Sequence, residues 1–566
     1  MKRPIIGIGI DSADPVLMER WMAKGHLKNL RKLKEQGVFC LIENTVNQAG
    51  RPVTTCSTER LWSMTWTSCR PDKTGFWDTT KFFPEDYHTS RECTEIGVDF
   101  KEYPPFYAVG ENYKVSVFDL PASGLSDKVN GLQILAWGGH YPFTPSHSRP
   151  AEALEQINQK YGKNEVLGND HGHWSDPKYA RWLYQALLRS IKTRRDIALD
   201  LMRRDTLDLF LMVFPETHSG GHDLLHLSHP DHPVYNRYKD KVIPDADPLL
   251  DIYEAVDKAV GEILADVPAD TYVFCFSIHG MGVNVTDLLS MAVVPELMYR
   301  YSFPGQVALA AGNPSVPPPP VRTGIGRKSW AGEVWVLNDE PNPLLRLVKP
   351  WLPKRFMPKS ANGLVSPWEL GARKVRANWM PAMWYSDLWP RMKAFGLPGF
   401  ADGHIRINLK GRDRDGVVDP ADYDAVCQEI TDLLNGLTNA RTGEPCVDRV
   451  VRTRRNPTED QDRDRLPGPD LIAIWNKNPK QPADVADSPQ LGRIGPFPHA
   501  RPGGHRSTGF LMASGPGIEA GKMGPTVEGV DIGPTLLTLM GAPVPAHLDG
   551  QPIADIIAAL QRNEAA

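Results

Sequence analysis

Three apolar runs along the chain each end at a polar segment. They cover residues 5–10, 207–214 and 272–276; the first ends at Asp11, the second opens into a histidine-rich stretch, and the third stops just before His279. Continuous apolar runs of this length are typical of strands buried on both faces of a parallel sheet. Because parallel strands bring their carboxyl ends to one edge, the pattern predicts an α/β fold with polar groups gathered at that edge.

Helical periodicity separates these runs. A helical pattern opens at Pro15 and extends to Leu33, another covers residues 248–265, and apolar positions between 426 and 437 mark one face of a third. A strand pattern returns at 405–409, core character resumes from 471 onward, and an alanine-rich helix follows Pro552. The alternation predicts a mostly parallel central sheet flanked by helices.

The stretch 301–400 has a different composition. Residues 317–320 are consecutive prolines, and seven of the 15 tryptophans fall within the stretch. Long connections without periodicity that are too apolar for a disordered linker are typical of lids, caps or inserted subdomains. We therefore expect a discontinuous core of residues 1–300 and 400–566, with residues 301–400 inserted as a Pro/Trp-rich cap over the site.

Composition and charge narrow the choice of partners. The 566 residues are 41% hydrophobic and 23% charged, with a net charge of -4, which is typical of a globular protein and excludes a collagen-like rod or a coiled coil. A near-neutral chain has no general electrostatic attraction for nucleic acid or an anionic membrane. No run approaches the roughly 18 apolar residues of a membrane span. We expect a small-molecule ligand, no nucleic acid and no membrane; the oligomeric state is left open.

The cysteines and the first residues bear on location. Seven cysteines are spread along the chain without paired CxxC spacing, which favours neither a disulfide framework nor a cysteine zinc site and suggests a reducing compartment. The first 15 residues lack the long apolar stretch and cleavage site of an export signal. We expect a cytoplasmic protein.

A pair of histidines has metal-ligand spacing. Five of the 16 histidines fall between positions 218 and 232, and His218 and His222 are four residues apart. This spacing lets both rings face one ion from a helix or a tight turn, and Gly220 and Gly221 favour the turn. A polar surface loop is the alternative reading of an isolated HxxxH.

Further ligand candidates are separated from this pair in sequence. His279 follows the third apolar run and precedes Gly280, and His505 follows two glycines, so the backbone at both can approach a ligand closely. With Asp11 and the histidine pair they supply enough nitrogen and oxygen ligands for one or two divalent ions, zinc first and manganese or iron as alternatives.

A nucleophile candidate lies in the hydroxyl-rich segment 54–63. Such segments are commonly turns or helix caps. A hydroxyl becomes an effective nucleophile only when a metal or a base lowers its pKa, so this segment matters only if it lies beside the ligands above.

The order of these motifs resembles the alkaline phosphatase superfamily, and within it the type I phosphodiesterase/nucleotide pyrophosphatase branch. The order is a strand-end aspartate, a hydroxyl before a tryptophan and a TG-like turn, a spaced histidine, a His-Gly-Met and a late histidine. The resemblance covers about residues 1–300 and 400–555, including the tail motifs at 531–537 and 547–550. It implies an alkaline-phosphatase-like α/β core and a metal-dependent hydrolase of phosphate esters, a phosphodiesterase or a phosphatase.

The resemblance also implies a role for each motif. Asp11 corresponds to the metal ligand after the first strand. Thr58 corresponds to the nucleophile, because it precedes Trp62 by four residues and Thr67 by nine. The histidine ligands correspond to His222, His279 and His505.

Two positions depart from the family pattern. The family's aspartate before His222 is His218 here, which keeps a ligand but removes a negative charge, and its aspartate before His279 is Ile278, which removes a ligand. Glu216 or water is a candidate to complete the depleted site. The two inferred sites are His218, His222 and His505 in the first, and Asp11, Thr58 and His279 in the second.

The implied reaction is substitution at phosphorus through a covalent phosphoryl-enzyme intermediate on Thr58. One ion would hold the threonine oxygen as an alkoxide, and the other would polarise the ester. Such transfers depend mainly on positioning and charge neutralisation. Arg60 and Arg506, which lie near Thr58 and His505 in sequence, are candidates to bind the phosphate oxygens.

Two alternatives remain at this stage. Sulfatases share the fold and modify a cysteine in a Cys-x-Pro-x-Arg sequence, which resembles residues 56–60, although Cys56 lies two residues too early relative to Thr67. The second alternative is a binding protein that kept the fold and lost catalysis, which Ile278 motivates.

Overall fold

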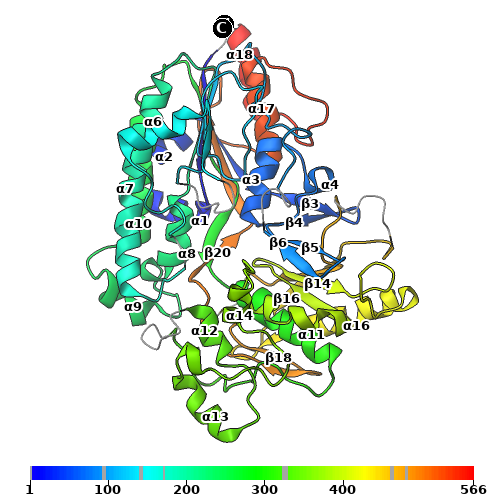
Figure 1. Ribbon diagram of the computed structural model, residues 1–566. Helices are drawn as coiled ribbons and strands as arrows, with labels where there is room; N and C mark the ends of the chain where they lie inside the picture. Colours follow the sequence, from blue (N-terminus) through cyan, green and yellow to red (C-terminus); the bar gives the residue numbers. More distant parts are fainter. Residues whose placement is uncertain are drawn as a thin grey trace.

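A nine-stranded sheet forms the centre of the molecule. The computed structural model describes residues 3–91, 97–138, 145–169, 172–321, 329–458, 465–477 and 482–565. The strand order is β22-β2-β21-β11-β1-β10-β7-β8-β9, and the five strands from β11 to β8 run parallel, which confirms a mostly parallel central sheet (Figure 1). The strands are β1 (Ile5–Ile10), β2 (Val38–Glu43), β7 (Val115–Phe118), β8 (Gln133–Leu135), β9 (His147–Arg149), β10 (Leu209–Phe214), β11 (Tyr272–Ser277), β21 (Thr508–Ser514) and β22 (Lys522–Met523).

The three predicted apolar strands lie side by side in this sheet. β1 pairs with β10 on one side and with β11 on the other, both in parallel. Ile10 is opposite Phe214 and Gly9 is opposite Phe276, so the three strands end at nearly the same level. The prediction that their polar continuations share one sheet edge is confirmed.

Helices cover both faces of the sheet, as predicted. Along β1, Ile5 packs into one apolar core, while Ile6 and Ile8 pack into the other. The two sets of helices lie on opposite sides of the strands in Figure 1. One core involves α1 (Pro15–Ala23), α2 (Lys28–Glu35), α7 (Pro177–Met202), α8 (Glu216–Ser228) and α10 (Pro248–Leu264), and the other involves α3 (Thr58–Thr67), α17 (Ile532–Met540) and α18 (Ala554–Ala565).

The helical pattern predicted from Pro15 to Leu33 is two helices. Asp14 caps α1 by accepting a hydrogen bond from the Leu17 amide, and α1 ends at Ala23. Gly25 has a φ of 89°, a left-handed conformation that glycine adopts readily, and the chain turns there before α2 begins. The apolar periodicity continued across the turn because both helices pack on the same sheet face.

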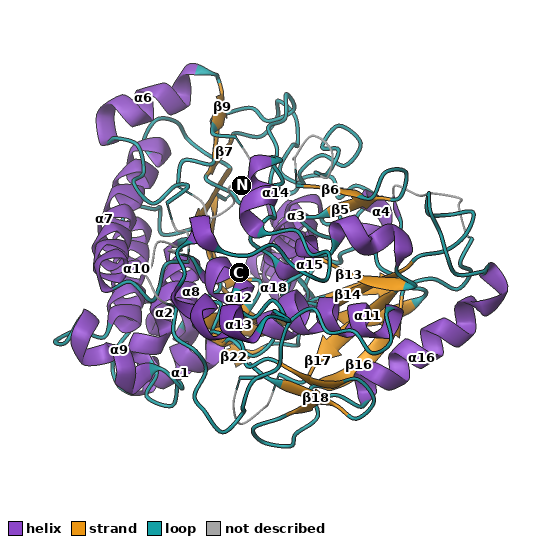
Figure 2. Ribbon diagram, turned by 60° about the horizontal axis from the view of Figure 1, so that its bottom comes forward, coloured by secondary structure: helices purple, strands orange, loops and turns teal. Residues whose placement is uncertain are grey.

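A second sheet lies beside the edge where the parallel strands end. Its order is β13-β14-β17-β16, all antiparallel, and Figure 2 shows it next to α11 (Val294–Ser302) and α16 (Tyr423–Asn435). One apolar core joins Phe82 and Tyr87 to residues from 288 to 497, including the buried Trp335, Trp384 and Trp389. That core therefore takes residues from the 301–400 stretch and from both sides of it. The strands are β13 (Ala394–Leu397), β14 (Gly403–Ile407), β16 (Val447–Arg452) and β17 (Leu471–Trp475).

Smaller elements complete the described fold. Among the described residues, no helix is both long and apolar enough to cross a membrane. The short helices are α4 (Pro71–Thr74), α6 (Glu152–Tyr161), α9 (Tyr235–Val242), α12 (Trp330–Trp335), α13 (Pro343–Val348), α14 (Pro367–Ala372) and α15 (Pro381–Trp384). The short strands are β3 (Thr45–Gln48), β4 (Arg51–Thr54), β5 (Lys81–Phe83), β6 (His88–Ser90), β12 (Gly280–Val283), β15 (Thr438–Asn439), β18 (Ala486–Ser488), β19 (Gly492–Ile494) and β20 (Gly503–Arg506).

A buried ionic network fixes the start of α8 against the sheet. The Arg194 side chain is fully buried, and it donates to Asp119 Oδ2 at 2.7 Å and to Glu216 Oε1 at 2.9 Å. Ser190 also donates to Glu216 Oε1, at 2.6 Å. Glu216 is thus engaged inside the protein, on the side of α8 that faces α7.

Removing Arg194 should destabilise the protein strongly. In Arg194→Met the carboxylates of Asp119 and Glu216 stay buried without their counter-charge, and we expect a loss of about 3–5 kcal/mol in the free energy of unfolding, measured by urea denaturation. Arg195→Met is the matched control, since its partners are more exposed and its loss should stay within about 1 kcal/mol. Equal losses in the two variants would contradict this account.

Candidate active site

Asp11 lies at the end of β1, inside a ring of polar groups. The residue is 1% exposed, and its Oδ1 accepts a hydrogen bond of 3.0 Å from Trp62 Nε1. Oδ2 is 3.1 Å from His218 Nδ1, and Oδ1 is 3.3 Å from His279 Nε2. Burial alone would raise the pKa of the Asp11 carboxyl, but the charges and hydrogen bonds of the two histidines outweigh burial and hold that pKa well below its ordinary value.

Ser12 follows Asp11 in a strained conformation. Its φ is 59°, which is uncommon for a residue other than glycine. The conformation brings Ser12 Oγ to 2.9 Å from His218 Nδ1 and 3.4 Å from His279 Nδ1. The serine hydroxyl therefore helps to orient both rings.

The histidine-rich segment after β10 is the helix α8, and the predicted turn at its glycines is wrong. Gly220 and Gly221 lie inside this helix. A Cβ on Gly220 would be 2.8 Å from Ile252 Cδ1, and one on Gly221 would be 2.8 Å from Met281 Cγ. The glycines thus permit close packing of α8 on α10 and β12, and tertiary packing overrides their low helix propensity. His218 and His222 lie one turn apart, with ring centroids separated by 4.6 Å.

His279 lies in the turn between β11 and β12 and is fully buried. Its Nε2 lies 3.3 Å from Asp11 Oδ1, and its Nδ1 lies 3.3 Å from the Gly280 carbonyl. The preceding Ile278 points into the apolar core with α3 and α17. At the position where the family carries an aspartate, this chain therefore has a core residue.

The β12–β20 pair brings His505 to the same place. His505 is opposite Met281 in this antiparallel pair, and its ring centroid lies 4.7 Å from that of His279. Gly503 passes so close to α8 that a Cβ there would be 2.0 Å from the Gly221 carbonyl oxygen. Desolvation of the ring, together with the nearby charges of the other histidines and of Arg501, lowers the pKa of His505 well below its ordinary value. The ring is held neutral, with a lone pair to offer.

Thr58 is the first residue of α3 and faces His505. It is 4% exposed, and its Oγ1 lies 3.1 Å from both ring nitrogens of His505. Trp62, one turn along α3, holds Asp11, and Gly9 allows the approach because a Cβ there would be 2.9 Å from the Trp62 ring. The amino end of a helix favours negative charge, which places Thr58 where a phosphate group would be stabilised.

Ligand atoms of three histidines lie close enough to bind one ion. The ligand atoms of His218, His279 and His505 all lie within 4.8 Å of one another. Among the described residues, these three form the group of His, Cys, Asp or Glu side chains that could hold a metal ion. Imidazole nitrogens bind zinc at about 2.0–2.1 Å, so modest ring movements would close this group on an ion. With the Asp11 carboxylate beside two of the three rings, the geometry fits a divalent metal. The grouping differs from the set His218, His222 and His505 inferred from the sequence.

A cavity of about 610 Å³ opens beside this cluster. Its wall includes Thr58, His218 and His505, together with Arg60. Aromatic residues form the outer part, where the Trp379 and Phe400 rings are 5.7 Å apart and the Trp330 and Trp379 rings are 6.4 Å apart. A cavity of this size suits a small organic molecule with one polar end and one apolar end.

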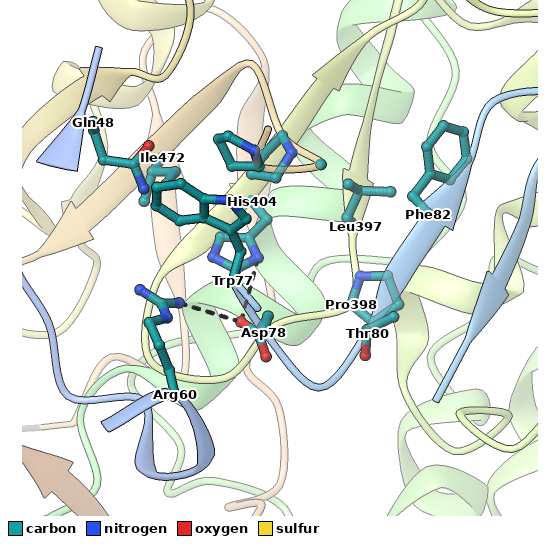
Figure 3. A pocket seen from close by; sticks show the side chains of 13 residues that line it. Gln48, Arg60, Trp77, Asp78, Thr80, Phe82, Leu397, Pro398, His404 and Ile472 are labelled. Atoms are coloured by element: carbon teal, nitrogen blue, oxygen red, sulfur yellow. Dashed lines mark ion pairs between the residues drawn. The ribbon is translucent and has the colours of Figure 1, made fainter. Parts of the chain in front are cut away.

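The two predicted phosphate-binding arginines differ in position. Arg60 lines the cavity, and its guanidinium donates to Thr55 Oγ1 at 3.0 Å and lies 3.6 Å from Asp78 Oδ2. Figure 3 shows Asp78 between Arg60 and His404, in a smaller adjoining pocket. Arg506 is not part of the cavity wall, because its guanidinium donates to the carbonyls of Val283 and His505.

Arg501 is a cavity residue that the sequence pattern did not reveal. Its Nη1 lies 3.0 Å from His222 Nε2, and its Nε donates to Asp287 Oδ2 at 2.6 Å. The only sequence signal is its place four residues before His505. Asp287 is 214 residues away, so nothing local indicates the pair.

Cys56, the residue of the sulfatase alternative, is fully buried and outside the cavity wall. Its Sγ lies 3.1 Å from Lys477 Nζ, whereas Ser57 and Thr58 face the cavity. The described cysteines are free and buried. The local geometry thus favours the threonine over the cysteine.

Comparison with known families agrees with the motif order. A family model described as type I phosphodiesterase / nucleotide pyrophosphatase matches residues 5–296, just over half of the chain. The chain belongs to this family. The resemblance inferred from the motifs is confirmed, and membership supports hydrolysis of phosphate esters. No curated protein matches the sequence.

Several solved structures are similar over most of their length. A murine ectonucleotide pyrophosphatase / phosphodiesterase 5 is 11% identical, with 96% of this chain and 97% of that chain covered and a TM-score of 0.43. Its human counterpart is 10% identical, with 97% of each chain covered and a TM-score of 0.44. A phosphonoacetate hydrolase from Sinorhizobium meliloti 1021, in complex with phosphonoformate, is 12% identical, with 99% of this chain and 95% of that chain covered and a TM-score of 0.41.

The purified protein should carry an unmodified Cys56. A buried thiol outside the cavity cannot serve as the precursor of a catalytic formylglycine, so intact-mass and peptide mass spectrometry should give the mass of the unmodified chain. Cys56→Ala should also retain hydrolysis of phosphate esters to within a few-fold. A mass deficit at this cysteine, or a complete loss of activity in the variant, would instead support the sulfatase mechanism.

Proposed function

We propose that the protein is a metal-dependent hydrolase of small phosphate esters, of the phosphodiesterase or phosphatase type, with Thr58 as its nucleophile. The observation that carries the proposal is the position of Thr58: its hydroxyl lies at the amino end of α3, on the cavity wall, 3.1 Å from a histidine of the metal-binding group. Family membership supplies the reaction class.

The reaction proceeds in two displacements. In the first, the deprotonated Thr58 oxygen forms a bond to phosphorus as the bond to the leaving alcohol oxygen breaks, and that oxygen takes a proton from water. In the second, the hydroxide left by that proton transfer attacks the phosphoryl-threonine, the bond to Thr58 breaks and leaves its oxygen deprotonated as at the start, and phosphate or a phosphate monoester is released. A bound divalent ion lowers the pKa of a coordinated hydroxyl and neutralises charge on the phosphoryl oxygens.

The surrounding residues position the reacting groups. Asp11 and Ser12 orient the rings of His218 and His279, which is the usual task of groups behind metal-binding imidazoles. The low pKa of His505 keeps that ring neutral and able to offer a lone pair. Arg60, anchored by Asp78, adds positive charge to the cavity wall.

The 301–400 stretch is proposed as the cap that shapes the organic side of the pocket. Trp330, Arg376, Trp379 and Phe400 from this stretch line the cavity that contains Thr58. Apolar aromatic walls favour an ester with an aromatic or bulky apolar group, so aryl phosphate esters are suitable assay substrates. Zinc is the proposed metal and the cytoplasm the proposed location, the latter from the cysteine pattern alone.

Replacing Thr58 should abolish turnover. We expect Thr58→Ala to lower kcat/KM for an aryl phosphodiester or monoester by at least about 10³-fold, because the variant lacks the hydroxyl proposed to form the covalent intermediate. Rapid acid quenching of the wild type should trap a phosphorylated peptide containing Thr58. Thr54→Ala, in β4 and outside the cavity wall, is the control. Equal turnover by Thr58→Ala would disprove the assignment, and an inactive wild type would favour the binding-protein alternative.

Removing the metal should remove the activity. After treatment with a strong chelator and desalting, hydrolysis of the same ester should fall to the background rate, and Zn²⁺ or Mn²⁺ should restore it. Circular dichroism before and after chelation controls for unfolding. Full activity in protein shown by elemental analysis to be metal-free would contradict the proposed metal dependence.

A further inference from the structure

We propose that the site binds one divalent ion, on His218, His279 and His505, and that the guanidinium of Arg501 supplies the second positive charge beside it. The number of ions is argued from the positions and charges of the residues. The role of Arg501 in the reaction rests on the proposed function.

The three histidines are the group whose ligand atoms converge. His218 and His279 are buried, His505 opens to the cavity, and the ligand atoms of all three lie within 4.8 Å of one another. Asp11 faces two of the rings and provides a counter-charge behind them.

His222 lies beside the cluster, but both of its ring nitrogens have hydrogen-bond partners other than an ion, although its spacing from His218 suggested a shared ion. Its Nδ1 lies 2.8 Å from the Gly503 carbonyl oxygen, and since a carbonyl only accepts, this nitrogen carries the proton. The lone pair of the neutral ring is then on Nε2, which accepts from Arg501 Nη1 at 3.0 Å and also lies 3.0 Å from His505 Nε2. An ion bound at His222 would have to displace a guanidinium that Asp287 holds in place.

The charges of the site also favour one ion. Asp11 is the carboxylate in contact with the rings, and a deprotonated Thr58 adds one more negative charge. Ile278 lies in the apolar core, and Asp287 is paired with Arg501. Two negative charges match one divalent ion, whereas two ions would leave an uncompensated excess of positive charge in a partly buried site.

Arg501 is held in a fixed position on the cavity wall. Its Nε donates to Asp287 Oδ2 at 2.6 Å, and its guanidinium carbon lies 4.8 Å from the centre of the Phe400 ring. It lines the cavity together with Thr58 and His505. The planar, permanently charged guanidinium fork suits phosphate oxygens, and its fixed position means that little entropy is lost on binding.

Metal stoichiometry tests the proposal. The full-length protein is stripped with a chelator, loaded with Zn²⁺, desalted and measured by elemental analysis, with isothermal titration of Zn²⁺ into the stripped protein as a second measurement. We expect about one ion per wild-type chain. His279→Ala and His505→Ala should lose it, whereas His222→Gln should keep it, and circular dichroism verifies folding.

Arg501 is tested on the same preparations. Arg501→Gln should retain about one ion per chain but lose about 10²–10³-fold in kcat/KM for an aryl phosphate ester, the loss typical for one donor to a developing charge. Arg501→Lys should recover part of that activity. An Arg501→Gln variant with wild-type kcat/KM would remove Arg501 from the proposal.

Other outcomes separate this proposal from the proposed function. Two ions per wild-type chain, no bound ion, or loss of the ion in folded His222→Gln would each overturn the one-ion site. Ester hydrolysis with two bound ions would sustain the proposed function and defeat the one-ion inference. A single bound ion with no ester hydrolysis would sustain the one-ion inference and defeat the proposed function.

Discussion

The site depends on the register of three parallel strands. Because β1 pairs in step with β10 and β11, the residues that follow them leave the sheet at one level. This places His218 Nδ1 and His279 Nε2 within 3.1 and 3.3 Å of the Asp11 carboxylate, although the residues are more than 200 positions apart. A slip of one residue would reverse the faces of a strand, so the apolar cores on both sides of the sheet fix the positions of the polar groups at its edge.

The strand β20, which carries His505, reaches the site because glycines allow close packing of backbones. Gly503 allows β20 to contact Gly221 of α8, and Gly220 allows the same helix to lie against α10. These contacts carry His505 to within reach of Thr58 and of the histidines on α8. A side chain at either contact would push β20 or α8 outward, and the rings would separate.

The sequence was informative where one physical signal dominates. The apolar runs predicted β1, β10 and β11, and the rule for parallel strands predicted that Asp11 and His279 would meet. The helix α8 could not be predicted locally, because its glycines are explained only by the neighbours they pack against. Arg501 and Asp287 meet across 214 residues without any shared motif.

The position of Arg506 outside the cavity wall has a simple cause. Arg506 is adjacent to His505 on β20, and side chains alternate between the faces of a strand. With His505 turned toward the histidine cluster, Arg506 is directed away from it, to the carbonyl of Val283. Arg501 precedes the strand and is not subject to this alternation. Recognition of β20 as a strand would therefore have predicted from the sequence alone that Arg506 and His505 point to opposite faces.

Unpartnered buried nitrogens do not by themselves identify a metal ligand, and α8 provides the comparison. His226, one turn beyond His222, is fully buried with both ring nitrogens unpartnered among the described residues. Its neighbours are the rings of Trp174, Tyr238 and His232, at 5.2, 5.5 and 6.1 Å, and burial lowers its pKa to about 3, so it remains a neutral core residue. His279 differs because two other imidazoles converge on it and a carboxylate lies behind it. The convergence of ligands, and not burial alone, distinguishes a metal site from a histidine enclosed by aromatic rings.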